Sequence, residues 1–252
     1  MSLRLVLLLA SATLFAGPAR AQLFSYDREA PRPTQAVAFI YVPVDFNYTG
    51  GGEPIDRFDF DDVAYGLQYT RPGLQIAVML GNHRPPGATA DEDLQLIDAS
   101  LFTWGEIGLT RELSGGANRI FIPIALHSGH RRVAVEDEAE TAIDAFSVTV
   151  IGIGTGVGFN LEHGMMQVVA RATPAIGIAT RSFGDATGSS TLFDGDVSLH
   201  IGPLIGRFGL HFGYAYRSQR WNVGSSDLLE DVAEDYFDYS GSTHLVRAGI
   251  SF

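Results

Sequence analysis

The sequence of 252 residues contains no cysteine and no lysine. Without cysteine, disulfide bonds cannot supplement the core, so stability has to come from packing or from a closed sheet. Basic residues are few as well: 17 face 29 acidic residues, and the formal net charge is −12. We expect no nucleic-acid partner, because duplex binding requires a basic surface.

Long hydrophobic runs are also scarce, and the clearest one lies at the start of the chain. The apolar run Leu5–Phe15 follows a basic start and precedes Ala19–Ala21, which fits a small-x-small cleavage site. The pattern predicts a signal peptide over 1–21, because the run is too short to cross a bilayer as a helix. We expect an N-terminal segment over 22–34 and one domain over 35–252.

Apolar residues recur at every second position along most of the remaining chain. In GRFGLHFGYAYR (Gly206–Arg217), aromatic and leucine side chains alternate with Gly, His, Ala and Arg. Strands point successive side chains to opposite faces, so one face is apolar and the other is small and polar. Many runs reach ten residues, about the length that a tilted strand needs to cross a bilayer. A lipid-facing surface around a packed polar lumen is typical of a transmembrane barrel.

The alternating runs predict ten strands, and short and long connections alternate between them. The strands are expected near residues 36–47, 57–70, 73–82, 96–111, 118–128, 144–159, 165–181, 191–201, 206–221 and 243–252. This layout predicts an all-β fold, a closed antiparallel transmembrane β-barrel with short periplasmic turns and long extracellular loops. Eight or twelve strands are alternatives, because boundaries read from sequence carry errors of several residues.

These features together resemble a small Gram-negative outer-membrane β-barrel protein. In that family, alternating apolar residues before a terminal aromatic form the signal for the barrel-assembly machinery. Val246, Ala248, Ile250 and Phe252 match this assembly signal, whereas His244 stands where an apolar residue is usual. The resemblance implies an outer-membrane location in the cell envelope, with a periplasmic N-terminal segment over 22–34 and one outer-membrane β-barrel domain over 35–252. Its implied partners are membrane lipid, lipopolysaccharide and the assembly machinery.

The stretch VIGIGTGVGF (Val150–Phe159) carries glycine at every second position. It departs from the G-x-G-x-x-G dinucleotide fingerprint, which starting from Gly152 would require glycine at Val157. If the stretch is a strand, its isoleucines point outward and its glycines form a row without side chains, the glycine stripe, on the inner face. We expect the stripe to make room for large inward side chains such as Phe121 and Arg171, with a ligand groove as the alternative.

Charged residues of both signs fall on the predicted inner face. Buried charges are normally paired, so we expect a lumen network of ion pairs. Its members are Asp62, Glu106, Arg171, Arg181, Asp194, Asp196, Arg207, Arg217 and Arg247. A polar pore lining is the alternative. A barrel near eight strands is just wide enough for side chains to fill, whereas open channels occur at about sixteen strands.

His127 and Ser128 invite comparison with lipid-deacylating barrels, which space these two residue types two positions apart. Here they are adjacent, so a strand would point them to opposite faces. A nucleophile and its base need direct hydrogen-bond contact. We therefore expect no serine hydrolase site here.

Asp59 and Asp61, with Asp194 and Asp196, resemble the paired carboxylates of outer-membrane barrel proteases. That family places an Asp-x-His pair opposite an Asp pair, and this sequence contains no Asp-x-His. Paired carboxylates can orient a water, but the mechanism is incomplete without its general base.

Two further sets of residues lie at strand ends or in loops. Acidic runs at 90–93, 135–140 and 226–240 lack the spacing of a calcium loop. They predict a solvated rim with weak divalent cation binding at most, and we expect no cofactor and no dedicated metal site. Aromatic residues near strand ends predict interfacial girdles: Tyr41, Tyr65, Tyr69, Trp104, Tyr214, Tyr216 and Trp221.

The sequence therefore predicts a non-enzymatic, porin-like outer-membrane protein, acting as a structural or surface protein or as a narrow passive conduit for small solutes. Two alternatives belong to other classes. One is an outer-membrane barrel hydrolase acting on lipid or peptide. The other is a soluble secreted β-sandwich that binds a ligand.

Overall fold

The computed structural model describes residues 35–50, 57–84, 93–110, 118–135, 143–181, 187–224 and 236–252. The predicted signal and N-terminal segment, residues 1–34, lie outside this part of the chain. The strands are β1 (Ala36–Gly50), β2 (Arg57–Arg71), β3 (Leu74–His83), β4 (Leu94–Thr110), β5 (Arg119–Val135), β6 (Ile143–Thr155), β7 (Val157–His163), β8 (Met166–Arg181), β9 (Thr187–Ile205), β10 (Phe208–Gly224) and β11 (Tyr236–Ser251). Within the described ranges, no helix is long and apolar enough to span a membrane.

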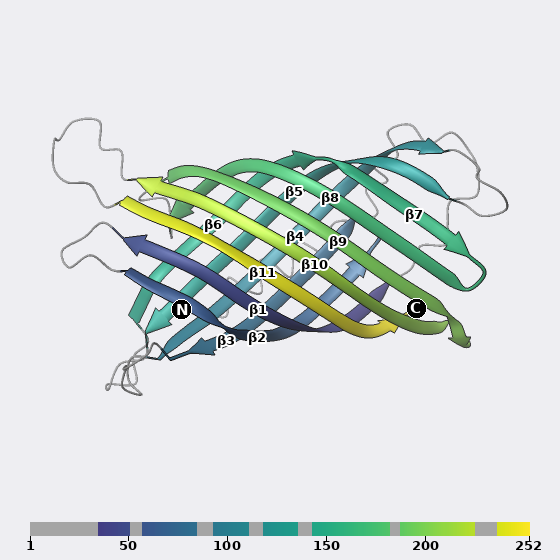
Figure 1. Ribbon diagram of the computed structural model, residues 1–252, viewed down its shortest axis with the longest axis horizontal. Helices are drawn as coiled ribbons and strands as arrows, with labels where there is room; N and C mark the ends of the chain where they lie inside the picture. Colours follow the sequence, from purple (N-terminus) through teal and green to yellow (C-terminus); the bar gives the residue numbers. More distant parts are fainter. Residues whose placement is uncertain are drawn as a thin grey trace, which may run out of the picture.

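The strands form one closed antiparallel sheet (Figure 1). Apart from β6 and β7, each strand pairs with its neighbour in sequence, and β11 returns to pair with β1. β6 and β7 occupy one position between β5 and β8, with a break at Gly156. The ring therefore has ten positions among the described residues, which confirms the predicted closed barrel of about ten strands.

The two ends of the barrel differ in their connections. Tight turns join β2 to β3, β7 to β8 and β9 to β10, and the glycines Gly73, Gly164 and Gly206 have φ of 74°, 59° and 59° there. A φ in this left-handed region favours glycine. This is the turn end, at the right of Figure 1 beside the C-terminus. The opposite loop end carries the connections after β1, β3, β5, β8 and β10.

Several strands extend further toward the loop end than predicted. β5 continues to Val135 rather than 128, β9 begins at Thr187 rather than 191, and β11 begins at Tyr236 rather than 243. The predicted boundaries followed the point where apolar residues stop alternating on the outer face. The sheet continues past that point, because backbone pairing does not require lipid on its outer side.

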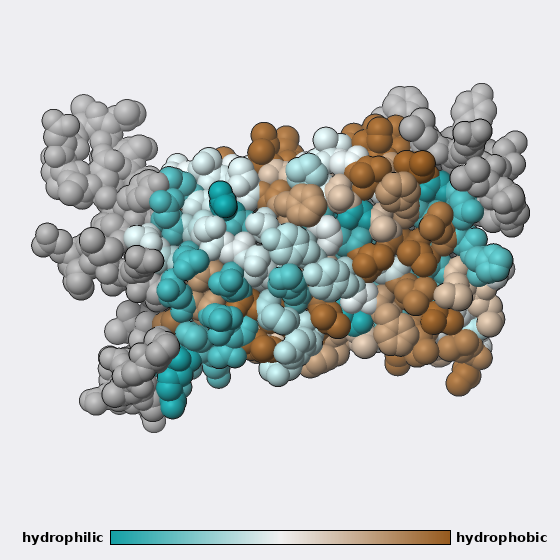
Figure 2. All heavy atoms as spheres, in the orientation of Figure 1, coloured by the Kyte–Doolittle hydropathy of each residue, from teal (hydrophilic) through white to brown (hydrophobic). Residues whose placement is uncertain are grey.

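The outer surface is divided into an apolar and a polar zone. On β10, the outward residues Phe208, Leu210, Phe212 and Tyr214 are exposed near the turn end, whereas Arg220 is exposed near the loop end. Figure 2 shows the same division across the face formed by β1, β9, β10 and β11, hydrophobic at right and hydrophilic at left. We call the apolar zone the apolar band. Such a large exposed apolar area marks contact with lipid or another apolar partner.

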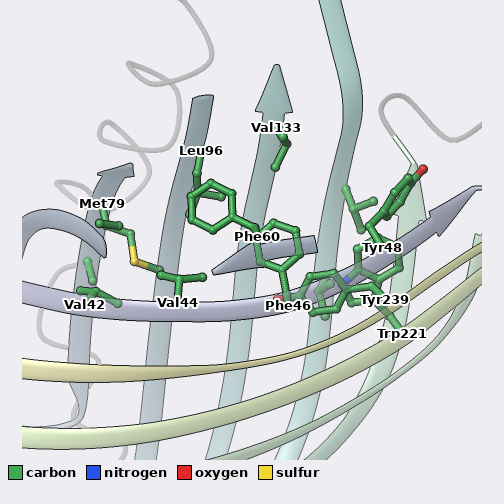
Figure 3. Packing of buried hydrophobic residues seen from close by; sticks show 14 of the residues in the cluster. Val42, Val44, Phe46, Tyr48, Phe60, Met79, Leu96, Val133, Trp221 and Tyr239 are labelled. Atoms are coloured by element: carbon green, nitrogen blue, oxygen red, sulfur yellow. The ribbon is translucent and has the colours of Figure 1, made fainter. Parts of the chain in front are cut away.

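Hydrophobic side chains occupy much of the loop-end half of the lumen (Figure 3). This apolar cluster comprises Ile40, Val42, Val44, Phe46, Tyr48, Phe60, Ala64, Ala77, Met79, Leu94, Leu96, Val133, Val148, Val150, Ala179, Ala215, Trp221, Val223, Tyr239 and Leu245. The expectation of a hydrophilic interior is therefore wrong for this half. The inner face of β1 is apolar from Ala36 to Tyr48 and forms one side of the cluster.

Candidate functional site

Asp194 on β9 lies at the centre of a buried ion-pair group in the lumen. Its carboxylate is 2.7 Å from the guanidinium of Arg171 on β8 and 3.0 Å from that of Arg217 on β10. The Asp194 side chain is 1% exposed. Antiparallel pairing places Asp194 directly opposite Arg217, and opposite charges facing across strands stabilise a sheet. One carboxylate thus pairs with two arginines, one from each of its two neighbouring strands.

Asp196, two residues further along β9, forms a second ion pair. Arg247 Nη1 on β11 donates to Asp196 Oδ2 at 2.6 Å. Arg247 also donates to Ser198 Oγ at 3.2 Å, and Ser198 Oγ donates to Asp196 Oδ1 at 3.2 Å. These contacts extend the charged group around the wall from β8 to β11.

Three hydrogen bonds connect this group to the opposite wall of the barrel, and one of them runs from Gln75 Nε2 to Asp196 Oδ2 at 3.3 Å. Arg217 Nη1 donates to Ser100 Oγ on β4 at 3.2 Å. Arg171 Nη2 donates to Gln75 Oε1 on β3 at 3.1 Å. We call the set the central polar layer: Gln75, Ser100, Arg171, Asp194, Asp196, Ser198, Arg217 and Arg247. Because its members bond across the lumen, the layer occupies the cross-section at this height.

Arg171 also lies between two aromatic rings. Its guanidinium carbon is 4.1 Å from the centroid of Phe102 and 4.3 Å from that of Trp104, both on β4. Cation–π contacts of this kind gain strength when the groups are desolvated. Trp104 therefore faces the lumen, and its predicted place in an interfacial girdle is wrong.

The buried pair formed by Asp98 and Arg131 was not predicted. Arg131 Nε on β5 donates to Asp98 Oδ2 on β4 at 2.7 Å. Arg131 also donates to the hydroxyl of Tyr239 across the barrel and lies over the Phe46 and Tyr239 rings. The pair thus joins the polar half of the lumen to the apolar cluster. The pair could have been predicted if the register of β4 with β5 had been known, because the two residues are directly opposite each other in that pairing.

Stacked aromatic rings dominate the apolar cluster above this pair. Trp221 and Tyr239 stack with centroids 4.8 Å apart and an interplanar angle of 5°. Phe46 and Phe60 stack at 5.1 Å and 6°. Figure 3 shows the four side chains grouped on the inner side of the wall. Trp221 is 3% exposed, so its predicted position in an outer girdle is also wrong.

Four of the predicted network residues lie apart from the central polar layer. Glu106 pairs with Arg119 and accepts a hydrogen bond from Trp104 Nε1 at 3.2 Å. Asp62 lies near the loop end, 46% exposed, with its carboxylate 3.5 Å from His83 Nδ1.

The other two are arginines near the barrel ends. Arg207 is exposed in the β9–β10 turn, over the ring of Phe208, and so does not face the lumen. Arg181 is the last residue of β8, and its side chain lies outside the described part of the structure. The lumen network therefore takes in Arg171, Asp194, Asp196, Arg217 and Arg247 from the predicted set.

Three histidines among the described residues are buried in the lumen, and of these only His211 was placed on the polar inner face from the sequence. His127 on β5 lies beside Phe102, with centroids 6.2 Å apart. His200 on β9 and His211 on β10 are cross-strand partners near the turn end, with ring centroids 4.5 Å apart. Neither ring nitrogen of His211 has a hydrogen-bond partner among the described residues. The pair faces the lumen on the turn-end side of Arg247, so it belongs to the polar part of the interior.

Neither of the two hydrolytic constellations weighed from the sequence is assembled. His127 is 3% exposed on the inner face of β5, and the neighbouring Ser128 points to the other face. Asp59 and Asp61 are exposed on the outer face of β2, whereas Asp194 and Asp196 are buried inside. The two aspartate pairs thus lie on opposite sides of the wall.

The glycine stripe serves packing. A Cβ at Gly158 would collide with the ring of Phe121, as expected from the sequence. At Gly152, Gly154 and Gly156, a Cβ would instead meet the backbone of β8. Ile151, Ile153, Val157 and Phe159 are exposed on the outer face, as predicted. Arg171, the other expected occupant, contacts Phe102 and Trp104.

The four residues of the predicted assembly signal alternate along the end of β11 and the residue that follows it. Val246, Ala248, Ile250 and Phe252 all point outward and are exposed. Phe252 and Gln35 exchange backbone hydrogen bonds of 2.9 and 3.2 Å at the turn end. His244, which departs from the signal pattern, also points outward, and its Nδ1 lies 2.7 Å from the Tyr214 hydroxyl.

No group of three or more His, Asp or Glu side chains suitable for a metal occurs among the described residues. Most of the acidic runs lie in the undescribed segments 85–92, 136–142 and 225–235. Asp93, at the end of one run, accepts a hydrogen bond of 2.6 Å from Arg84 Nη2. This bond holds the pKa of the Asp93 carboxyl below its ordinary value.

Several solved outer-membrane proteins show a similar architecture. The outer membrane protease OmpT from Escherichia coli is 7% identical, with a TM-score of 0.40 over 90% of this chain and 98% of that chain. The translocator domain of the autotransporter NalP from Neisseria meningitidis is 12% identical, with a TM-score of 0.32 over 89% of each chain. Ail, the attachment invasion locus protein of Yersinia pestis, is 11% identical, with a TM-score of 0.24 over 87% and 98%. No protein-family model and no curated protein matches the sequence.

Proposed function

We propose that this chain is an integral outer-membrane β-barrel protein with a closed lumen, serving as a structural and surface-exposed protein. The apolar band supports the membrane location, because a closed ring of strands is one of the two structures that can span a bilayer. Membrane lipid and lipopolysaccharide would contact this band. The polar outer face near the loop end would project beyond the membrane.

The observation that carries the closed lumen is the set of hydrogen bonds between opposite walls. Arg217 reaches Ser100, and Arg171 reaches Gln75, through the middle of the barrel. The apolar cluster then occupies much of the loop-end half. A ten-stranded barrel is close to the size that side chains fill, so a wide aqueous channel is not expected.

The barrel hydrolase has less support than a structural role. Its two candidate constellations are separated by the barrel wall or point to opposite faces. A nucleophile and a base that cannot meet cannot share a proton. Assays on lipid A and on peptides should therefore show no turnover above that of a Ser128→Ala or Asp59→Ala variant.

Membrane location is tested first by fractionation. The mature protein should sediment with the outer membrane, require detergent for extraction and migrate differently in gels before and after heating. Recovery as a soluble periplasmic or extracellular protein would contradict the proposal and favour the soluble binding protein.

Planar-bilayer conductance then tests the closed lumen. The wild-type protein should give no steady current steps. The same current is measured for a triple variant, Phe46→Ala, Phe60→Ala, Trp221→Ala, which empties part of the apolar cluster. The variant is used only if it retains heat-modifiable migration. Regular steps from the wild type would overturn the closed lumen and support a narrow passive conduit.

A further inference from the structure

A groove of about 370 Å³ lies on the outer surface near the loop end, across β9, β10, β11 and β1. Its volume is at the lower end of the range for small-molecule sites. Six neutral hydrogen-bonding side chains line it: Asn47, Thr49, Ser189, Thr191, Asn222 and Ser240. Hydroxyl and amide groups can both donate and accept hydrogen bonds, so the lining suits a ligand rich in hydroxyls.

The strand register arranges this lining in two parallel rows. One row runs from Thr191 through Arg220 and Ser240 to Asn47. The other begins at Ser189 and ends at Thr49, crossing the same four strands. Neighbouring strands are about 4.8 Å apart, so each row is about 15 Å long. The groove is therefore long enough for a chain of linked units rather than one small ion.

The groove begins at the edge of the apolar band and rises away from it. On β9, Thr191 is only two residues beyond exposed Phe193. On β1, Asn47 is six residues beyond exposed Tyr41. With about 3.3 Å per residue and a tilt of about 45°, these separations are about 5 Å and about 14 Å along the membrane normal. The polar headgroup region of a bilayer extends about 5–8 Å beyond its hydrocarbon, so the outer end of the groove lies above phospholipid headgroups.

The charges of the groove balance. Among the described residues that line it, Arg220 and Asp238 carry the charges, one of each sign, and Asn222 Nδ2 donates to Asp238 Oδ1 at 3.2 Å. Asp59 and Asp61 are exposed on the adjoining outer face of β2. A neutral groove beside two carboxylates disfavours a densely phosphorylated ligand, because like charges repel.

We propose that this groove binds the saccharide headgroup of a glycolipid whose acyl chains lie against the apolar band. The inference rests on the proposed membrane location, because the band must face lipid for a headgroup to reach this height. It assigns the outer wall of the barrel a specific lipid site.

The test measures lipid binding to the purified full-length mature barrel in detergent by native mass spectrometry. The probes are lipopolysaccharide with its core sugars, lipid A alone, phosphatidylglycerol and the free core oligosaccharide. The groove variant is Thr191→Leu, Asn222→Leu. Asn82→Leu is the matched control, because Asn82 is also exposed on the outer face near the loop end, on β3.

Lipopolysaccharide should bind the wild type and Asn82→Leu equally, and the groove variant at least tenfold more weakly. The wild type should bind lipid A, phosphatidylglycerol and the free oligosaccharide at least tenfold more weakly than it binds lipopolysaccharide. Equal binding by the groove variant, or binding of lipid A or free oligosaccharide as tight as the intact lipid, would overturn the site. A wild type that needs no detergent would instead overturn the membrane location.

Discussion

Arg217 on β10 donates a hydrogen bond to Ser100 on β4 at 3.2 Å, across the interior of the barrel and 117 residues away in sequence. The same guanidinium group pairs with Asp194 on the neighbouring strand. One side chain thus ties its own wall to the opposite wall. The lumen is consequently part of the packed core of the protein.

Replacing Asp194 with asparagine should destabilise the barrel strongly. The substitution keeps the shape of the side chain but leaves Arg171 and Arg217 without their shared carboxylate. Removing one partner of a buried ion pair costs about 3–5 kcal/mol. The free energy of unfolding, measured by urea titration in detergent, should fall by that amount. Asp61→Asn on the outer face should change it little, and equal losses in the two variants would contradict a buried network.

Adding a methyl group at Gly158 should force the ring of Phe121 to move. We expect Gly158→Ala to lower the free energy of unfolding by about 1–3 kcal/mol, the usual range for overpacking. In a Phe121→Leu background the same change should cost much less, because the ring atoms that the new Cβ would meet are gone. A double-mutant cycle measures this coupling. Additive effects of the two substitutions would show that the ring does not limit position 158.

Removing the indole of Trp221 should weaken the loop-end half of the barrel. The ring is buried and stacks on Tyr239 at 4.8 Å. Trp221→Ala should lower the free energy of unfolding by about 3–5 kcal/mol, as for other buried aromatic truncations. Trp221→Phe should retain much of the stacking and lose less. An alanine variant as stable as the wild type would place the side chain outside the core.

Asp93 should show an acid-shifted titration that depends on Arg84. The side-chain hydrogen bond from Arg84 holds the Asp93 pKa below its ordinary value, so the bond favours the folded state above the usual aspartate range. That contribution is lost as pH falls through the lowered pKa. Carboxyl-carbon NMR of Asp93 should show its pKa rising toward the ordinary value in Arg84→Ala. An Asp93 titration that is unchanged in Arg84→Ala would contradict the contact. Arg207→Ala is the control variant, because Arg207 is distant from Asp93.

Deleting Phe252 should impair assembly more than it impairs the finished barrel. The side chain is exposed on the outer face, so the deletion removes mainly the two backbone hydrogen bonds with Gln35 and the ring contact with Phe208. If it belongs to the assembly signal, the fraction of protein in heat-modifiable form in the outer membrane should fall. Refolding of the deletion variant in detergent should remain close to that of the wild type. A normal level of the heat-modifiable form in cells would contradict the signal.

Much of the fold was predictable because strand alternation is local. The outward set along the end of β11 and the residue that follows it, from Val246 to Phe252, was identified from a period of two alone. The match between Gly158 and the Phe121 ring followed from the same reasoning. The ten-position ring was also predictable, since short and long connections alternate along the chain.

The lumen was less predictable, because residue type does not determine which face of a strand is inside. Trp104 and Trp221 are of the residue type that is usual in interfacial girdles, yet both face inward. Asp98 and Arg131 are 33 residues apart and meet only through the register of β4 with β5. A shift of one residue in that register would have moved either side chain to the other face.

The sequence by itself determined the closed antiparallel sheet and its lipid-compatible outer surface, because both follow from the alternation of neighbouring residues. Only the tertiary structure decided what fills the interior. Closing the ring brings Arg171 to Gln75, Arg217 to Ser100 and Arg131 to Tyr239. These partners lie about a hundred residues apart in the chain. No local pattern encodes such a meeting, because it depends on strand order and register around the whole barrel.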